Sequence, residues 1–227
     1  MRKILVIAAH PDDEVLGCGG TMARLAAEGR EVHIAILANG LTSRPDFDSA
    51  LAVESLKLHH ERAERASKLL GAASVHVMGF PDQKMDFLPQ LDITQAIERE
   101  IERLQPDTVF TQHGGDLNMD HVITYRATLT ATRPVSGRSV RRVYAYEVAS
   151  STEWAFQRFA PVFRPSVFFD IAETLERKIA AMQVYESETR AFPHPRSPEA
   201  LRSIALRWGS VVGVHAAEAF ELVREIQ

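Results

Sequence analysis

Residues 4–14 read Ile-Leu-Val-Ile-Ala-Ala-His-Pro-Asp-Asp-Glu, an apolar run that ends abruptly in an imidazole and three carboxylates. The part over residues 4–7 is short and continuous, as expected for a strand covered on both faces of a parallel sheet. A segment of helical periodicity follows over residues 21–28 and stops at Gly29, and residues 32–37 form the next apolar run. This strand-helix-strand order indicates an α/β fold.

The alternation of apolar runs and helical segments continues along the chain. The further expected elements are a helix over 50–70, a strand over 75–78, a helix opened by a capping box of Asp92 and Gln95, a strand over 108–111, a helix over 120–131, strands over 140–148 and 167–169, and three tail helices marked by Leu175, Leu201 and Phe220. Since we find no internal repeat and no long linker, we expect one domain over residues 1–227. The predicted fold is a Rossmann-like three-layer α/β/α sandwich with a mostly parallel sheet.

The composition excludes several broad classes of protein. The 227 residues are 45% apolar and 25% charged, with a formal net charge of −4. This is not a disordered chain, and it lacks the basic excess of a general nucleic-acid binder. No run of about 18 apolar residues is present for a transmembrane helix. A single cysteine, Cys18, suits a reducing compartment, so we expect a cytoplasmic location.

Polar clusters follow the first and the fourth expected strands. Residues 10–14 come after the first, and residues 113–121, His-Gly-Gly-Asp-Leu-Asn-Met-Asp-His, come after the fourth. Ligands of open parallel sheets bind at the carboxyl ends of the strands. An acidic helix cap would account for one or two of the first carboxylates, but not for His10. Crowded carboxylates raise one another's pKa values unless a cation lies between them, so the cluster predicts a metal site.

The spacing suggests which side chains hold the metal. His10 and Asp13 are three positions apart across a tight turn, so both can face one ion. A catalytic zinc site usually has three protein ligands and an open position for water. His121 is the candidate for the third ligand, with Asp120 beside it as a carboxylate that orients an imidazole. The alternatives are that His121 merely opens a helix, or that His113 is the ligand.

The same motifs make the chain resemble the PIG-L/LmbE-like deacetylases. The resemblance rests on His-Pro-Asp-Asp-Glu at residues 10–14, an Asp-His pair at residues 120–121 and Ala-Ala-Glu-Ala-Phe at residues 216–220. It covers nearly the whole chain. Members of that family are zinc-dependent enzymes that remove N-acetyl groups from amino-sugar derivatives. The resemblance therefore implies a hydrolase acting on an N-acetylated amino sugar or its conjugate, and it leaves a homo-oligomer open.

The resemblance also implies a role for each motif residue. The implied zinc ligands are His10, Asp13 and His121. Asp12 matches the general base of the family. In some members a histidine three residues before the last ligand polarises the substrate carbonyl, but this chain has Asn118 at that position. We expect His113 or Asn118 to stabilise the oxyanion, and we favour His113 because an imidazole can also carry charge.

These residues suit the hydrolysis of an amide. Zinc lowers the pKa of bound water toward about 7, Asp12 would take the proton, and the hydroxide would attack the acetyl carbonyl. Iron(II) or another divalent ion fits the same ligands. Asp82 and Arg196 are weaker candidates for contacts to a sugar hydroxyl and to an anionic substrate group. Their alternatives are a turn aspartate and a solvated loop arginine.

Two other functions remain open at this point. A metallo-phosphoesterase would use the same metal on a sugar phosphate or a nucleotide. A non-catalytic Rossmann-type module would bind a nucleotide, but the chain lacks Gly-x-Gly-x-x-Gly directly after the first strand. In each case we expect a small-molecule partner rather than nucleic acid, and no integral membrane segment.

Overall fold

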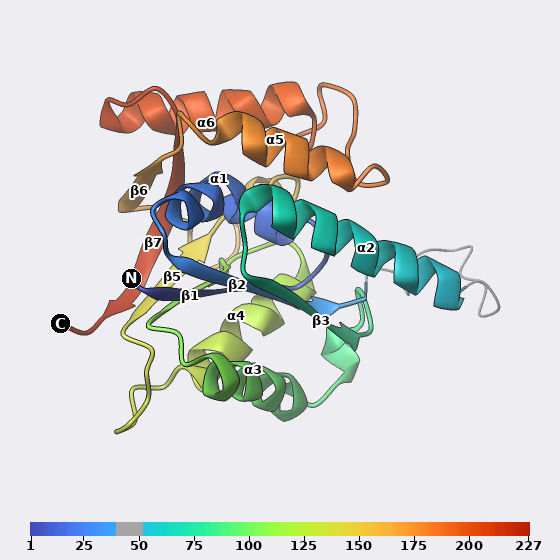
Figure 1. Cartoon of the computed structure of the whole chain (residues 1–227), viewed down its shortest axis with the longest axis vertical. Helices are drawn as coiled ribbons and strands as arrows, with labels where there is room; N and C mark the ends of the chain where they lie inside the picture. Colours follow the sequence, from blue (N-terminus) through green and yellow to red (C-terminus); the bar gives the residue numbers. More distant parts are fainter. Residues whose placement is uncertain (40–51) are drawn as a thin grey trace.

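A mostly parallel sheet forms the centre of the protein. The computed structural model describes residues 1–39 and 52–227. In this part of the chain the sheet has seven strands in the order β3-β2-β1-β4-β5-β7-β6 (Figure 1). The strands are β1 (Lys3–Ala8), β2 (Glu31–Ala38), β3 (Ser74–Phe80), β4 (Thr108–Gln112), β5 (Arg142–Tyr146), β6 (Val167–Asp170) and β7 (Ala217–Glu225). Strands β1 to β5 run parallel, and β7 runs antiparallel to both of its neighbours.

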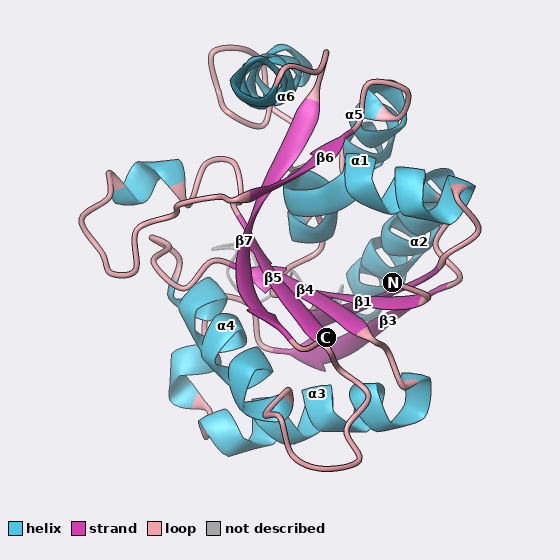
Figure 2. Cartoon of the chain, turned by 90° about the vertical axis from the view of Figure 1, so that its left-hand side faces the viewer, coloured by secondary structure: helices cyan, strands magenta, loops and turns pink. Residues whose placement is uncertain are grey.

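Helices cover both faces of this sheet. The helices are α1 (Asp13–Ala27), α2 (Ala52–Leu70), α3 (Gln90–Leu104), α4 (Met119–Ala131), α5 (Leu175–Val184) and α6 (Pro198–Val212), with short 3₁₀ turns η1 (Met85–Phe87) and η2 (Glu153–Ala155). Helices α1, α2 and α5 lie together on one face, while α3 and α4 lie on the other (Figure 2). Helix α6 packs on β7 and α5. The predicted three-layer α/β fold is confirmed. No helix within the described ranges is long and apolar enough to cross a membrane.

Strand β1 is the middle of this arrangement. It pairs with β2 on one edge and with β4 on the other, so both of its edges are satisfied. Ile4 and Val6 belong to the apolar core under α1 and α2, while Leu5 and Ile7 belong to the core under α3 and α4. Burial of alternate residues on opposite faces explains why the whole run is apolar.

Helix α1 begins eight residues earlier than its periodicity suggested. The expected helix over residues 21–28 is only the second half of α1, which starts at Asp13. Cys18 departs from helical geometry, with φ −145° and ψ 22°, and the kink interrupts the apolar period. Gly17 lets this part of α1 approach the sheet, because a Cβ there would lie 2.1 Å from the Tyr146 ring.

The last element of the chain is a strand, and the helix expected around Phe220 is wrong. Tyr144 pairs with Leu222 but Val143 pairs with Arg224, so Val223 is the extra residue of a β-bulge. Phe220 and Val223 therefore face the two different apolar cores, although a spacing of three had suggested one helix face.

One other helix start differs from expectation, and a second lies outside the described residues. Helix α3 begins at Gln90 after Pro89, and the N-cap makes no side-chain hydrogen bond, so Asp92 lies inside the first turn and forms no capping box. Helix α2 was expected from residue 50, but residues 50–51 lie outside the described residues. The other predicted elements are present within a few residues of their expected ends.

Candidate metal centre and active site

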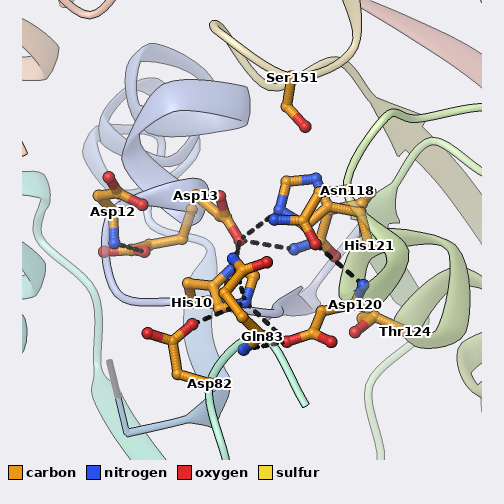
Figure 3. Close-up of polar contacts among 12 residues, drawn as sticks. His10, Asp12, Asp13, Asp82, Gln83, Asn118, Asp120, His121, Thr124 and Ser151 are labelled. Atoms are coloured by element: carbon orange, nitrogen blue, oxygen red, sulfur yellow. Dashed lines mark hydrogen bonds and ion pairs between the residues drawn. The ribbon is translucent and has the colours of Figure 1, made fainter. Parts of the chain in front are cut away.

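The polar clusters meet where β1 lies beside β4. After β1 the chain passes into α1 on one face of the sheet, and after β4 it passes into α4 on the other face (Figure 1). Such a reversal of strand order opens a crevice at the carboxyl ends of the strands, where α/β proteins bind their ligands. Figure 3 shows that side chains from the loops after β1, β3 and β4 converge there.

Three buried side chains offer an open set of metal ligands. His10, Asp13 and His121 each present one ligand atom, and these atoms lie within 4.8 Å of one another. The Asp13 Oδ2 atom lies 3.3 Å from His10 Nδ1 and 3.3 Å from His121 Nε2. Among the described residues, Asp13 Oδ1 and His121 Nε2 make no hydrogen bond although both are buried. Two imidazoles and a carboxylate with unsatisfied atoms fit a cation such as zinc.

A second group, His10, Asp82 and Asp120, is better described as a support for His10. The other ring nitrogen, His10 Nε2, donates to Asp120 Oδ2 at 3.0 Å and lies 3.2 Å from Asp82 Oδ1. The Asp120 carboxylate also accepts from the backbone amides of Gln83 (2.8 Å) and Met85 (3.0 Å). Since these donors occupy both of its oxygens, Asp120 orients the imidazole of His10, and not that of His121 beside it.

His121 has a carboxylate of its own, Asp116, which the sequence analysis did not select. Asp116 Oδ1 lies 3.3 Å from His121 Nδ1. The Asp116 carboxylate accepts from the Thr152 hydroxyl at 2.6 Å, from the backbone amide of Asn118 at 2.8 Å and from the Ser151 hydroxyl. Asp116 was visible in the sequence as a second aspartate in the run 113–121. The orientation of its side chain, however, depends on hydroxyl groups more than 30 residues away.

Electrostatics hold the ligand set in charged states. Burial opposes ionisation of Asp13, but the imidazoles of His121 and His10 outweigh it and keep the pKa of Asp13 well below its usual value. Burial likewise disfavours a charged His121, yet Asp13 and Asp116 raise its pKa to about 9. A bound divalent ion must displace the imidazole protons, so metal affinity is expected to fall with falling pH.

Asp12 points to a different partner from Asp13. Its backbone has φ 111°, a region that residues other than glycine rarely adopt, and its amide donates to Glu14 Oε2 at 3.0 Å. Burial raises the pKa of the Asp12 carboxyl well above its usual value, against the opposing charge of Arg196. A carboxylate with a raised pKa is suited to accept a proton near neutral pH.

Arg196 lies against Asp12 and is not a solvated loop residue. Its Nη1 lies 2.8 Å from Asp12 Oδ2 and 3.3 Å from Glu188 Oε2, and its Nε donates to Ser150 Oγ at 2.8 Å. Its charge is thus already committed to two carboxylates, which argues against the anion-binding role expected from the sequence. Nothing local in the sequence joins Arg196 to Asp12, because they are 184 positions apart.

Asp12 and Arg196 line a polar cavity of about 350 Å³. The other lining residues are His10, Pro11, His59, Arg62, Asp82, Gln83, Asn118, Tyr185, Ser187, Glu188 and Arg190. Asp82 and Asn118, both candidates from the sequence, therefore face the place where a substrate would bind. The volume is that of a site for a small molecule.

His113 does not reach this cavity. It is fully buried, its Nε2 donates to the Pro161 carbonyl at 2.9 Å, and its Nδ1 lies 3.3 Å from Glu221 Oε2. Both ring nitrogens are therefore directed to other partners. The preference for His113 over Asn118 is not supported, because periodicity and position along the chain do not fix which way a side chain at a strand end turns.

Comparison with known families agrees with this geometry. The sequence pattern of the family described as "PIG-L: GlcNAc-PI de-N-acetylase" matches residues 5–132, which is more than half of the chain and includes every residue of the ligand set. The chain belongs to the PIG-L family. The predicted resemblance is confirmed at this level.

Relatives within the PIG-L family carry deacetylase names. The chain is 27% identical over 234 residues to a diacetylchitobiose deacetylase from Thermococcus kodakarensis, covering 98% of this chain and 84% of the relative. It is 26% identical over 195 residues to a probable N-acetyl-alpha-D-glucosaminyl L-malate deacetylase 2 from Bacillus cereus, covering 84% of this chain and 85% of the relative.

The fold of the PIG-L family is also found with another named activity. The 4-carboxy-2-hydroxymuconate hydratase GalB from Pseudomonas putida superposes with a TM-score of 0.77 at 23% identity, covering 100% of this chain and 98% of that one. This likeness concerns the fold alone. A functional assignment must consequently rest on the side chains of the site.

Proposed function

We propose that this protein is a metal-dependent hydrolase that removes the N-acetyl group from an N-acetylated amino sugar or its conjugate. The observation that carries the proposal is the open ligand set of His10, Asp13 and His121, of which His10 lines the same polar cavity as the buried Asp12. The names of the PIG-L relatives, which act on N-acetylated sugars, support the same reaction.

The metal would be held by His10, Asp13 and His121, with Asp120 and Asp116 orienting the two imidazoles. Zinc is the ion that two imidazoles and one carboxylate favour, although iron(II) accepts the same donors. When bound, a divalent ion supplies a Lewis acid and a water of lowered pKa. Proton transfer and stabilisation of the oxyanion are carried out by side chains of the protein.

Asp12 acts as the general base in this proposal. Asp12 lines the cavity, and its carboxylate accepts a hydrogen bond from Arg196. Its backbone amide donates to the Glu14 carboxylate, which holds the loop in place. Asp12 takes the proton of the attacking water and returns it to the departing amine, so that one carboxylate serves first as base and then as acid. The Arg196 guanidinium fixes the direction of the carboxylate while this proton moves.

Asn118 takes the oxyanion role that the sequence analysis had favoured for His113. Its side-chain oxygen caps α4 by accepting from the Asp120 amide at 2.9 Å, which leaves the NH₂ end of the amide as a donor. Asn118 also lines the cavity, unlike His113. A fixed amide donor next to the reacting carbonyl stabilises the negative charge that develops on its oxygen.

The walls of the cavity suit a sugar. Asp82, Gln83 and Ser187 bring side-chain oxygens and an amide to it, and Tyr185 adds an aromatic ring. Hydroxyl groups of a sugar need such a dense set of donors and acceptors, because each polar group removed from water must find a partner.

A location in the cytoplasm and a single domain over the whole chain stay predictions.

The test is a substrate panel assayed for two products. Full-length protein with one zinc per chain is incubated with N-acetylglucosamine, N,N′-diacetylchitobiose and nucleotide-linked or acid-linked N-acetylglucosamine, and acetate and phosphate are both quantified. Release of acetate together with an equal amount of free amine supports the proposal. Release of phosphate instead would assign the site to a phosphoesterase, and release of neither across the panel contradicts the proposal.

A further inference from the structure

A second cavity lies apart from the one that contains Asp12. Its volume is about 340 Å³, and the two cavities share no lining residue. Its walls are largely apolar and include Phe159, Val162, Phe163, Leu201, Ile204 and Trp208. Helix α6 and the segment before β6 supply these apolar residues, and α1 and β7 complete the wall. A cavity of this size and composition is typical of a site for a small organic molecule.

Two carboxylates that line this cavity, Glu147 and Glu153, have no cation at ion-pair distance within the described ranges, but Glu153 accepts from the backbone amides of Ser150 and Ser151. Lys178 is already neutralised, since its Nζ lies 2.7 Å from Glu218 Oε1 and 2.8 Å from the Leu16 carbonyl. Within the described ranges no cation lies at ion-pair distance from Glu147, whose hydrogen-bond donor is the indole Nε1 of Trp208. The charged side chains that line the cavity are Glu147, Glu153, Lys178, Arg207 and Glu218, which sum to −1.

The surroundings of Glu147 make this charge costly. A carboxylate among apolar groups with one neutral donor is poorly solvated, and burial accordingly raises the pKa of Glu147. A positively charged donor would satisfy the carboxylate with a charge-assisted hydrogen bond. The face of Trp208 already carries a cation, since the Arg207 guanidinium lies 4.2 Å from the ring centre. Charge and lining together favour an apolar molecule with one cationic group.

The loop after β5 links the second cavity to the partners of His121 and Asp12. Thr152 lines the second cavity, and its hydroxyl donates at 2.6 Å to Asp116, which in turn lies 3.3 Å from His121. Two residues earlier, Ser150 accepts the hydrogen bond from Arg196, the partner of Asp12. A molecule that presses on Thr152 would therefore act on residues that hold both a metal ligand and the general base.

We propose that the second cavity binds a small organic amine, with its protonated nitrogen on Glu147 and its apolar body against Phe163, Ile204 and Trp208, and that its occupancy changes the rate of hydrolysis through residues 149–153. The binding part of this proposal does not depend on the identity of the substrate.

Binding is tested by calorimetry with three matched compounds. We would titrate 4-phenylbutylamine, 4-phenylbutanol and 4-phenylbutyrate into full-length, metal-loaded protein. The amine is expected to bind at one site per chain and at least about tenfold more tightly than the alcohol or the acid, the factor expected for a charge-assisted hydrogen bond. Equal affinity for all three compounds would contradict the proposal.

Variants locate the binding to this cavity. Glu147→Gln keeps the shape of the side chain and is expected to abolish the preference for the amine. Ala205→Phe adds a ring inside the cavity and is expected to abolish binding, whereas Leu206→Phe at the next position of α6, where Leu206 is 41% exposed, serves as the matched control. Unchanged amine binding in correctly folded Glu147→Gln would overturn the proposal even if Ala205→Phe failed to fold.

Turnover tests the effect on the active site. A saturating concentration of the amine is expected to change kcat for acetate release at least about twofold in the wild-type protein and to leave Glu147→Gln unaffected. Unchanged wild-type turnover would overturn the regulatory part. If no substrate releases acetate, the proposed hydrolase function fails. Calorimetry still decides whether the amine binds, because it needs no turnover, and it can be repeated with the catalytically impaired Asp12→Asn.

Discussion

Asp12 is distinguished from its neighbour Asp13 by its partners. Asp13 faces two imidazoles, while Asp12 faces the Arg196 guanidinium. Asp12→Asn preserves the shape of the side chain but cannot accept a proton, so we expect kcat to fall about 10²–10⁴-fold with unchanged metal content. Metal content and acetate release measured on the same preparation check this. Loss of the metal in Asp12→Asn would show that Asp12 is a ligand, and the roles of the two aspartates would be exchanged.

The oxyanion donor is decided by comparing Asn118 with His113. Asn118→Ser retains a hydroxyl to cap α4 but removes the amide donor, so we expect kcat to fall about 10²–10³-fold with little change in KM. His113→Gln is expected to lower stability and leave kcat within a few-fold, because His113 contacts Pro161 and Glu221. A larger loss of kcat in His113→Gln than in Asn118→Ser, at equal metal loading, would reverse the assignment.

For single residues, the sequence predicts which motifs belong to the site better than it predicts which way each side chain points. His10, Asp13 and His121 could be grouped because the carboxyl ends of neighbouring parallel strands share one edge of the sheet. The contact of Arg196 with Asp12 could not be foreseen, since it depends on where the loop before α6 passes over the crevice. The direction of His113 likewise depends on Pro161 and Glu221, which are remote in sequence.

Helix α1 is held close to the sheet by a residue without a side chain. A Cβ on Gly17 would lie 2.1 Å from the fully buried Tyr146 ring, whose hydroxyl donates to the Ile7 carbonyl at 2.7 Å. Gly17→Ala is therefore expected to lower the free energy of unfolding by about 1–3 kcal/mol. Gly19→Ala is the matched control and should cost less, because the atoms nearest to its Cβ, from Lys178 and Val15, lie at 3.2 Å. Equal urea-unfolding midpoints for Gly17→Ala and wild type would contradict this packing.

Helix α3 is joined to β3 by an ion pair that acid should break. Glu100 is buried and lies 2.9 Å from His76 and 2.6 Å from Arg103. Burial opposes its charge, but Arg103 and His76 outweigh burial and lower the pKa of Glu100 below its usual value. A pKa that is lower in the folded state means that the ionised form favours folding. The stabilisation is therefore complete above the unfolded pKa of about 4.3 and is lost as pH falls through the folded value.

The measurement is the free energy of unfolding at pH 6 and at pH 3.5 for wild type and Glu100→Gln. The difference between the two proteins should shrink at the lower pH by about 1 kcal/mol, the net contribution of a typical hydrogen bond. Glu102→Gln is the control, since Glu102 forms an exposed pair with Arg138, which contributes little. A pH-independent difference for Glu100→Gln would contradict the prediction.

Elements were predictable where one pattern dominated. The parallel strands β1 to β4 each have an apolar centre rich in β-branched residues and lie between helices, and each was located within about two residues. Strand β7 was missed because a bulge at Val223 replaces the two-residue alternation with a spacing of three. The start of α1 was missed because buried polar residues in its first turn, Asp13 and Glu14, do not count as an apolar face. A bulge and a set of buried polar residues thus hide elements from a search for periodicity.

For the whole molecule, the sheet determines which residues meet. Strand order β2-β1-β4-β5 brings the loops after β1, β4 and β5 to one edge, although the loop after β1 ends 100 residues before β4 does. Metal binding at this edge would join α1 to α4 across the sheet. We therefore expect one equivalent of zinc to raise the thermal midpoint of wild type by several degrees, and to leave His121→Ala unchanged. An equal rise in both proteins would place the metal elsewhere, for example at Asp82 and Asp120.

The measurement that tests the central claim most directly is acetate release by one preparation before metal removal, after removal, and after addition of one zinc per chain. The account predicts that acetate and free amine form in equal amounts, that turnover disappears in the metal-free protein, and that one equivalent of zinc restores it in wild type but not in His121→Ala. Full turnover without metal, or full turnover and full zinc occupancy in His121→Ala, would contradict the account.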